Sequence, residues 1–99
     1  MIRLARINVA MPGKAFELLA ALKEGNEVVK KVTGLEVMTF VSMGSKVGET
    51  VSVLNYRNLA EFEETSGKLL ASPEWQAFAR KFEGLIVPGA SHDHFLRQV

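Results

Sequence analysis

The spacing of apolar residues switches repeatedly along this chain, and the order of the switches restricts the folds that it can adopt. Alternation with a period of two, typical of a β-strand, runs through residues 2–10, 35–43, 49–57 and 90–98. Apolar spacings of three and four, typical of one face of a helix, run through residues 15–33 and 59–83. The predicted order is β-α-β-β-α-β. It predicts an α+β, ferredoxin-like fold, in which a four-stranded antiparallel sheet carries the helices on one face.

Residues that start and end helices lie at the borders of the helical segments. Asn58 and Glu61 form a variant of the capping box, in which each side chain satisfies a backbone N–H of the first turn. Ser72, followed by proline, predicts that a new helix starts within the second helical segment. Gly34 follows the first helix and is suited to a left-handed terminating residue.

Two polar or flexible stretches interrupt these patterns. Gly25 and Asn26 fall on the apolar stripe of the first helix, so we expect a bend or a loosened turn there. A polar residue on a buried stripe needs a partner, and Asn26 either caps a bent helix or reaches a ligand. Residues 44–48 are expected to form the turn of a hairpin between the second and third strands.

The second and third strands carry apolar residues on both of their faces, which helices on one side of a sheet do not explain. One side holds Leu35, Val37, Val41, Leu54 and Tyr56, and the other holds Met38, Phe40, Val51 and Val53. We interpret residues 1–99 as one domain with no spare element to cover the second face. We therefore expect a homodimer with two-fold symmetry. The alternative is a monomer with scattered surface hydrophobic residues.

Composition excludes several classes of function. The chain has no cysteine, which excludes disulfides, thiolate metal sites and a cysteine nucleophile. Its formal net charge of +1 does not indicate nucleic-acid binding or a polybasic membrane patch. No apolar run approaches the roughly 18 residues that span a bilayer, and the first residues do not resemble a signal peptide. We expect a cytoplasmic protein.

Three segments carry a resemblance to a known superfamily: Met11-Pro12-Gly13-Lys14 directly after the first strand, the segment 53–62, and the segment 70–76. The whole chain resembles the dimeric α+β barrel superfamily, and within it the NIPSNAP-like and antibiotic-biosynthesis-monooxygenase-like proteins. The resemblance implies a pocket in each subunit between the sheet and the helices. Members of the superfamily include cofactor-free monooxygenases, haem-degrading enzymes, isomerases and dehydratases, so fold alone does not fix the activity.

The resemblance also suggests site residues. The monooxygenase pattern of an Asn on the first strand with a Trp on a helix is partly matched by Asn8 and Trp75. Haem-degrading members supply an axial histidine from a helix. His92 and His94 both fall on the predicted last strand, which departs from that pattern.

The two histidines are candidate catalytic residues. A spacing of two on a strand points His92 and His94 to the same face, with Asp93 on the other. Such a pair suits a general base or two metal ligands, although a catalytic metal site needs a third protein ligand that no motif supplies. The alternative is one buried histidine satisfied by the backbone and one near the surface.

The candidate substrate-binding residues are Asn8, Tyr56, Trp75 and Phe78. Asn8 shares a strand face with Arg6, and the two suit an orienting amide and an anion-binding guanidinium. Tyr56 can offer its hydroxyl while its ring packs. Trp75, Phe78 and Phe82 form an aromatic stripe that either belongs to the core or forms the wall of a ligand site.

The first functional hypothesis is a dimeric protein that binds a small molecule, as a cofactor-independent monooxygenase or isomerase acting on a hydrophobic or aromatic substrate. Either histidine would transfer a proton, Asn8 would orient the substrate, and no cofactor or metal is expected. The alternative is a non-enzymatic dimer that binds a ligand or another protein. Haem binding through a histidine is a third possibility. The enzyme hypothesis requires Asn8, Tyr56, His92 and His94 to converge on one cavity.

Overall fold

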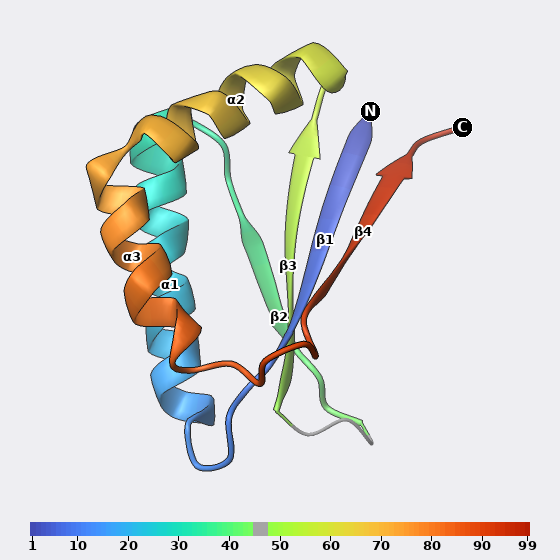
Figure 1. Ribbon diagram of the computed structural model, residues 1–99. Coiled ribbons are helices and arrows are strands. Elements are labelled where there is room, and N and C mark those ends of the chain that lie inside the picture. The colour runs from blue at the N-terminus through green and yellow to red at the C-terminus, as the bar shows by residue number, and fades with distance from the viewer. Residues whose placement is uncertain (45–47) are drawn as a thin grey trace.

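The computed structural model describes residues 1–44 and 48–99 (Figure 1). The elements of this part of the chain are β1 (Ile2–Val9), α1 (Ala15–Thr33), β2 (Met38–Val41), β3 (Glu49–Tyr56), α2 (Leu59–Ala71), α3 (Pro73–Glu83) and β4 (His92–Arg97). The strands form one antiparallel sheet in the order β2-β3-β1-β4. The predicted α+β, ferredoxin-like fold is therefore confirmed.

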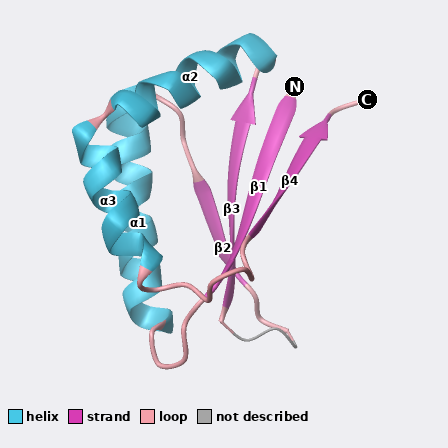
Figure 2. Ribbon diagram, in the orientation of Figure 1, coloured by secondary structure: helices cyan, strands magenta, loops and turns pink. Residues whose placement is uncertain are grey.

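All the helices lie on the same side of the sheet, as Figure 2 shows. α1 packs against α3 and α2, and α2 leads from the end of β3 to the start of α3. The stripe of α1 that contains Leu18, Leu22 and Val29 is buried, as its helical spacing predicts. Phe78 from α3 and Tyr56 from β3 complete this core. Among the residues described, no helix is both long enough and apolar enough to cross a membrane.

The first helix runs without a break through Gly25 and Asn26, where a bend or a loosened turn was predicted. Packing explains the glycine, because a Cβ atom at Gly25 would lie only 2.4 Å from Cζ of the Phe78 ring. The absent side chain allows α3 to place that ring directly on α1. The helix ends at Gly34, whose φ of 78° is the left-handed conformation predicted for it.

The two edge strands are shorter than predicted. β2 covers 38–41 rather than 35–43, and β4 covers 92–97 rather than 90–98. The backbone N–H of Ala90 donates to the carbonyl of Val87, so the chain is still turning where the alternation already suggested a strand. Of the hairpin turn predicted at 44–48, residues 45–47 lie outside the described part of the chain.

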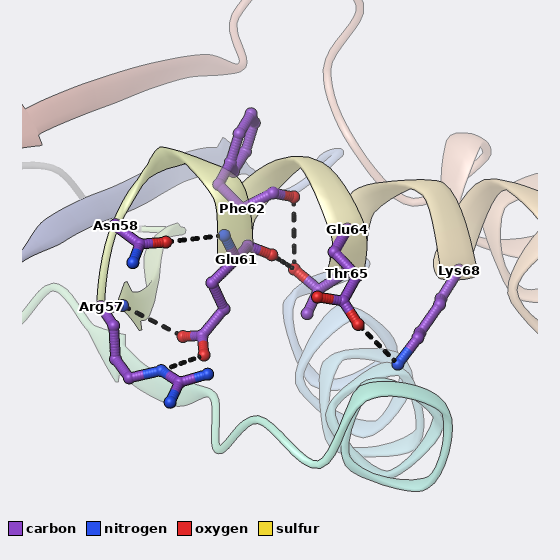
Figure 3. A network of polar contacts seen from close by, with 7 residues as sticks. All are labelled: Arg57, Asn58, Glu61, Phe62, Glu64, Thr65 and Lys68. Carbon is purple, nitrogen blue, oxygen red and sulfur yellow. Dashed lines mark hydrogen bonds and ion pairs between the residues drawn. The ribbon is translucent and has the colours of Figure 1, made fainter.

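Side chains cap the second and third helices as predicted, and Figure 3 shows the cap of α2. Oδ1 of Asn58 accepts a hydrogen bond from the backbone N–H of Glu61 at 2.9 Å. The Glu61 carboxylate accepts from the backbone N–H of Arg57 at 3.0 Å and from its Nε at 2.6 Å, which lowers the pKa of Glu61. Oγ of Ser72 accepts from the backbone N–H of Trp75 at 3.3 Å. These caps fix where the chain turns toward the helical layer.

The register assigns every strand residue to one of two faces. On β1, Leu4, Arg6 and Asn8 face the helices, and we call this side of the sheet the helical face. Ala5 and Ile7 alternate with them and point to the other side, which we call the open face. Cross-strand partners share a face, so these positions assign β2, β3 and β4 as well.

Candidate functional site

Two adjoining hollows separate the helical face from the helices. The first has a volume of about 300 Å³ and the second about 400 Å³. They adjoin, because five residues line both: Leu4, Arg6, Val29, Leu54 and Trp75. Together they are large enough for a small organic molecule, since ligand pockets are commonly about 300–1,000 Å³. The pocket implied between sheet and helices is therefore present.

Aromatic rings form the walls of both hollows. Trp75, Phe78 and Phe82 from α3 line the first, with ring centres 5.2 Å and 5.5 Å apart along the row. In the second hollow, Phe62 lies edge-on to Tyr56 at 5.2 Å and beside Phe95 at 4.8 Å. These separations are typical of favourable aromatic pairs. The aromatic stripe of α3 thus has both roles considered for it, since Phe78 is buried core and also lines the cavity.

Buried polar groups form the floor of the first hollow. Asn8 is 2% exposed, and its Oδ1 accepts a hydrogen bond from Oγ of Ser91 at 3.0 Å. Its cross-strand partner Thr50 is also 2% exposed, and Oγ1 of Thr50 has no hydrogen-bond partner among the described residues, but Thr50 is not one of the residues that line either hollow. Asn8 is therefore the member of this buried pair that a ligand in the first hollow would contact.

An ion pair stands at the junction of the two hollows. Nε and Nη2 of Arg6 donate to Oδ1 and Oδ2 of Asp93 at 2.8 Å and 3.0 Å. The hydrogen bonds from Arg6 hold the pKa of Asp93 below its usual range and raise the pKa of the guanidinium. Burial raises the pKa of the nearby Tyr56 phenol. Asp93 is a weak base because its pKa is lowered. Tyr56 keeps its proton at neutral pH because its pKa is raised, so it is not suited to be a base either.

Asn26 connects the helical layer to the sheet. Its amide nitrogen donates to Oγ1 of Thr39 at 2.9 Å, and that oxygen lies 3.2 Å from Oγ of Ser52. Asn26 and Ser52 both line the first hollow. The asparagine therefore does not cap a bent helix. It joins α1 to β2 and β3 at one end of the cavity.

The two histidines lie on the open face, away from the cavity. His92 pairs with Ile7 and His94 with Ala5 across β1, and both side chains are exposed. Their ring centres are 5.3 Å apart. The residues described include no group of three or more His, Cys, Asp or Glu side chains that could hold a metal ion.

The structure therefore brings together only part of the predicted site. Asn8, Tyr56, Trp75 and Phe78 line the cavity, whereas His92 and His94 point to the other side of the sheet. A scheme in which a histidine transfers a proton beside Asn8 is wrong within one protomer. This is because Asp93, which alternates with the histidines, occupies the helical face instead.

Sequence reasoning missed two residues of the site, Asp93 and Ser91. The alternation on the last strand placed Asp93 opposite the histidines, but it did not show which face the helices cover. The available signal was that Asp93 shares a strand face with Phe95 and that Arg6 lies on a neighbouring strand. Pairing β1 with β4 was the additional step needed to use it.

This fold, with a cavity between sheet and helices, defines a ferredoxin-like α+β protein. Within that class, the chain belongs to the NIPSNAP family, because the sequence model of that family matches residues 6–98. None of the curated proteins matches the sequence.

Solved structures agree with this assignment. A NIPSNAP domain protein from Burkholderia xenovorans superposes with a TM-score of 0.85 at 17% identity, covering 100% of this chain and 95% of that one. A NIPSNAP family protein from Agrobacterium tumefaciens has a TM-score of 0.82 at 26% identity, covering 99% and 92%. A structure described as an antibiotic biosynthesis monooxygenase has a TM-score of 0.76 at 12% identity, covering 100% and 99%. At that identity, the likeness to the monooxygenase concerns the fold alone.

Proposed function

We propose that this protein binds a small, mainly apolar molecule with a polar end in the cavity between the sheet and the helices. One observation carries the proposal: Asn8, a polar side chain only 2% exposed, lines the first hollow together with the aromatic rings of α3. A ligand oxygen would accept a hydrogen bond from its amide N–H. The aromatic walls would pack against the apolar remainder of the ligand.

A matched pair of asparagine variants tests this proposal. 2-Acetonaphthone, a two-ring ketone, is titrated by calorimetry into the wild type, Asn8→Ala and Asn55→Ala. Asn55 lies on β3 but points to the open face, where its Oδ1 accepts from Arg3. We expect binding to the wild type and to Asn55→Ala, and affinity about tenfold lower for Asn8→Ala, since a lost hydrogen bond leaves a ligand oxygen unpaired. Equal affinity in all three proteins would remove Asn8 from the site.

The enzymatic form of this proposal is a cofactor-independent monooxygenase or isomerase acting on a hydrophobic or aromatic substrate. The fold likeness to the structure described as an antibiotic biosynthesis monooxygenase supports it. The cavity, however, holds Asp93 paired with Arg6 and no histidine, so it supports binding and polarisation of a carbonyl more directly than proton abstraction. Non-enzymatic ligand binding is therefore the form we favour. Oxygen uptake with a naphthalenediol, present in the wild type and lost in Asn8→Ala, would reverse that preference.

We also propose that two copies of the chain pair through their open faces. Met38 and Phe40 are about half exposed on that face and pair with Val53 and Val51, and Leu96 is about half exposed on the same face of β4. Soluble monomers rarely leave a large contiguous apolar patch in water. A second copy of the same face would cover it with two-fold symmetry and would place His92 and His94 at or near the interface.

A further inference from the structure

Arg6 is central to the cavity because it is the charged residue that lines both hollows. Its side chain is 47% exposed, so part of the guanidinium faces the space that a ligand would occupy. Two other charged groups border the cavity, Asp93 in the second hollow and Glu83 in the first. Asp93 is the one that contacts Arg6.

Arg6 has N–H donors that its hydrogen bonds to Asp93 do not use, and a guanidinium has no acceptor. A guanidinium has five N–H groups, and Asp93 accepts from one on Nε and one on Nη2. Three N–H groups therefore remain for a ligand or for water. Asn8 lies two residues along the same face of β1, and its amide NH₂ group is also a donor. The polar end of a ligand that contacts these groups therefore has to accept hydrogen bonds.

The charges of Arg6 and Asp93 together then determine which kind of acceptor the cavity binds. Asp93 binds Arg6 through both carboxylate oxygens and neutralises it. A ligand carboxylate would approach Asp93 as well as Arg6, and like charges at close range repel. A ketone, quinone or ester oxygen can accept the free N–H groups without that repulsion.

We propose that Asp93 is a specificity-determining residue that makes this cavity select uncharged carbonyl compounds over carboxylates of the same size. The proposal depends on the binding function proposed above and adds the chemical class of the polar end. Asp93 acts by screening the charge of Arg6 and by occupying the two N–H groups that a carboxylate would otherwise bind. Removing its charge therefore changes the preference between ligands rather than binding as such.

Three probes of one shape test the selection: 2-acetonaphthone, 2-naphthoate and naphthalene, titrated by calorimetry at neutral pH. For the wild type, we expect the ketone to bind about tenfold more tightly than either of the others, since a hydrogen bond to a charged donor contributes about that factor. Asp93→Asn keeps the shape of the side chain and removes its charge. In this variant we expect the affinity for 2-naphthoate to rise about tenfold while that for the ketone changes less than about threefold.

Glu63→Gln is the matched control, because it removes the same charge from an exposed position on α2. It should leave the order of the three probes unchanged. Arg6→Gln is a second test of the same proposal, and we expect it to reduce the advantage of the ketone over naphthalene, with the contribution of Asn8 remaining. Circular dichroism establishes that each variant is folded before it is titrated.

The outcomes separate this inference from the function on which it depends. If the wild type binds 2-naphthoate as tightly as the ketone, or if Asp93→Asn leaves their ratio unchanged, the role of Asp93 is wrong and the binding function stands. If none of the probes binds the wild type, the binding function fails and the selectivity fails with it.

Discussion

Each face of the sheet carries side chains that its surroundings would not require. Near one end of the sheet, the helical face carries the polar residues Asn8 and Thr50, each only 2% exposed. The open face carries Phe40 at 54% exposure and Met38 at 45%. In an antiparallel sheet with one covered face, the covered face is ordinarily apolar and the other polar. This departure supports the two proposals made above, that the cavity holds a polar ligand atom and that the open face pairs with another protein surface.

The largest expected effect comes from placing a charge on the open face. In Phe40→Asp, each protomer would bring an unpaired carboxylate into the proposed dimer interface. Burying an uncompensated charge costs at least about 3 kcal/mol, so we expect dissociation to be favoured by more than about a hundredfold. Analytical ultracentrifugation of the wild type and the variant across a concentration series measures the effect.

Phe16→Asp is the control for the open face. Phe16 is 89% exposed on α1 and lies outside the sheet, so the same substitution there should leave the oligomeric state unchanged. A wild type that sediments as a monomer at all concentrations would contradict the proposed dimer. It would also leave the apolar side chains of the open face without an explanation.

The second effect concerns how the helices close over the helical face. In Gly25→Ala, the new Cβ would meet the Phe78 ring at 2.4–2.8 Å, so that α1 and α3 must separate. Overpacking costs about 1–3 kcal/mol, which exceeds the gain of up to about 1 kcal/mol from replacing a helical glycine. We expect a free energy of unfolding that is lower by about 1–2 kcal/mol, measured by urea denaturation.

Gly67→Ala provides the comparison, because no atom lies within 4 Å of a Cβ built at this position in α2. There the helix propensity alone should act and stabilise the protein by about 0.5–1 kcal/mol. If both variants stabilise the protein, the contact between Gly25 and Phe78 does not limit how the helices pack. A Gly25→Ala, Phe78→Leu double variant should recover part of the loss, because the smaller side chain makes room for the methyl group.

Gly25 also shows which part of the fold could be predicted from the sequence. Periodicity gave the order of the elements and the fold class, because an alternating strand and a striped helix each have a single way to bury their apolar side. Caps at Asn58 and Ser72 were predictable because they act within one turn. The role of Gly25 depends on Phe78, more than fifty residues away, and local propensity could only suggest a break in the helix.

The candidate site was also predicted only in part, because some of its features depend on contacts between distant parts of the chain. Asn8, Tyr56, Trp75 and Phe78 line the cavity as expected, since their own strands and helix fix their direction. The histidines were assigned to the wrong face because alternation shows that His92 and Asp93 point apart without showing which is covered. That choice depends on how β4 pairs with β1, which is a long-range property.

The third expected effect is a modest loss of stability at acidic pH, caused by the ion pair between Arg6 and Asp93 on the helical face. Hydrogen bonds from Arg6 lower the pKa of Asp93 in the folded state relative to the unfolded value of about 4. The stabilisation is therefore present above about pH 4 and is lost as the pH falls through the lowered value. The Asp93 side chain is 40% exposed, so we expect about 0.2–1 kcal/mol, the range for exposed ion pairs.

Urea denaturation of the wild type and Asp93→Asn at neutral pH and near pH 3 measures this contribution. The difference between the two proteins should be larger at neutral pH, where Asp93 is ionised in both the folded and the unfolded states, than near pH 3, where protonation of the unfolded state removes part of the stabilisation. A difference that does not change with pH would mean that the ion pair contributes no net stability in solution.

The smallest expected effect is the one that most directly separates the two faces. Because His92 and His94 point away from the cavity, His92→Ala and His94→Ala should bind 2-acetonaphthone within about twofold of the wild type, whereas Asn8→Ala loses about tenfold. The same histidine variants should change the dimer dissociation constant, because their rings lie on the open face beside Ile7 and Ala5. If either histidine variant instead loses ligand affinity while it remains dimeric, a histidine from one protomer reaches the cavity of the other. The separation between a ligand face and an assembly face would then be wrong, and a histidine base would again be a candidate for the chemistry of the site.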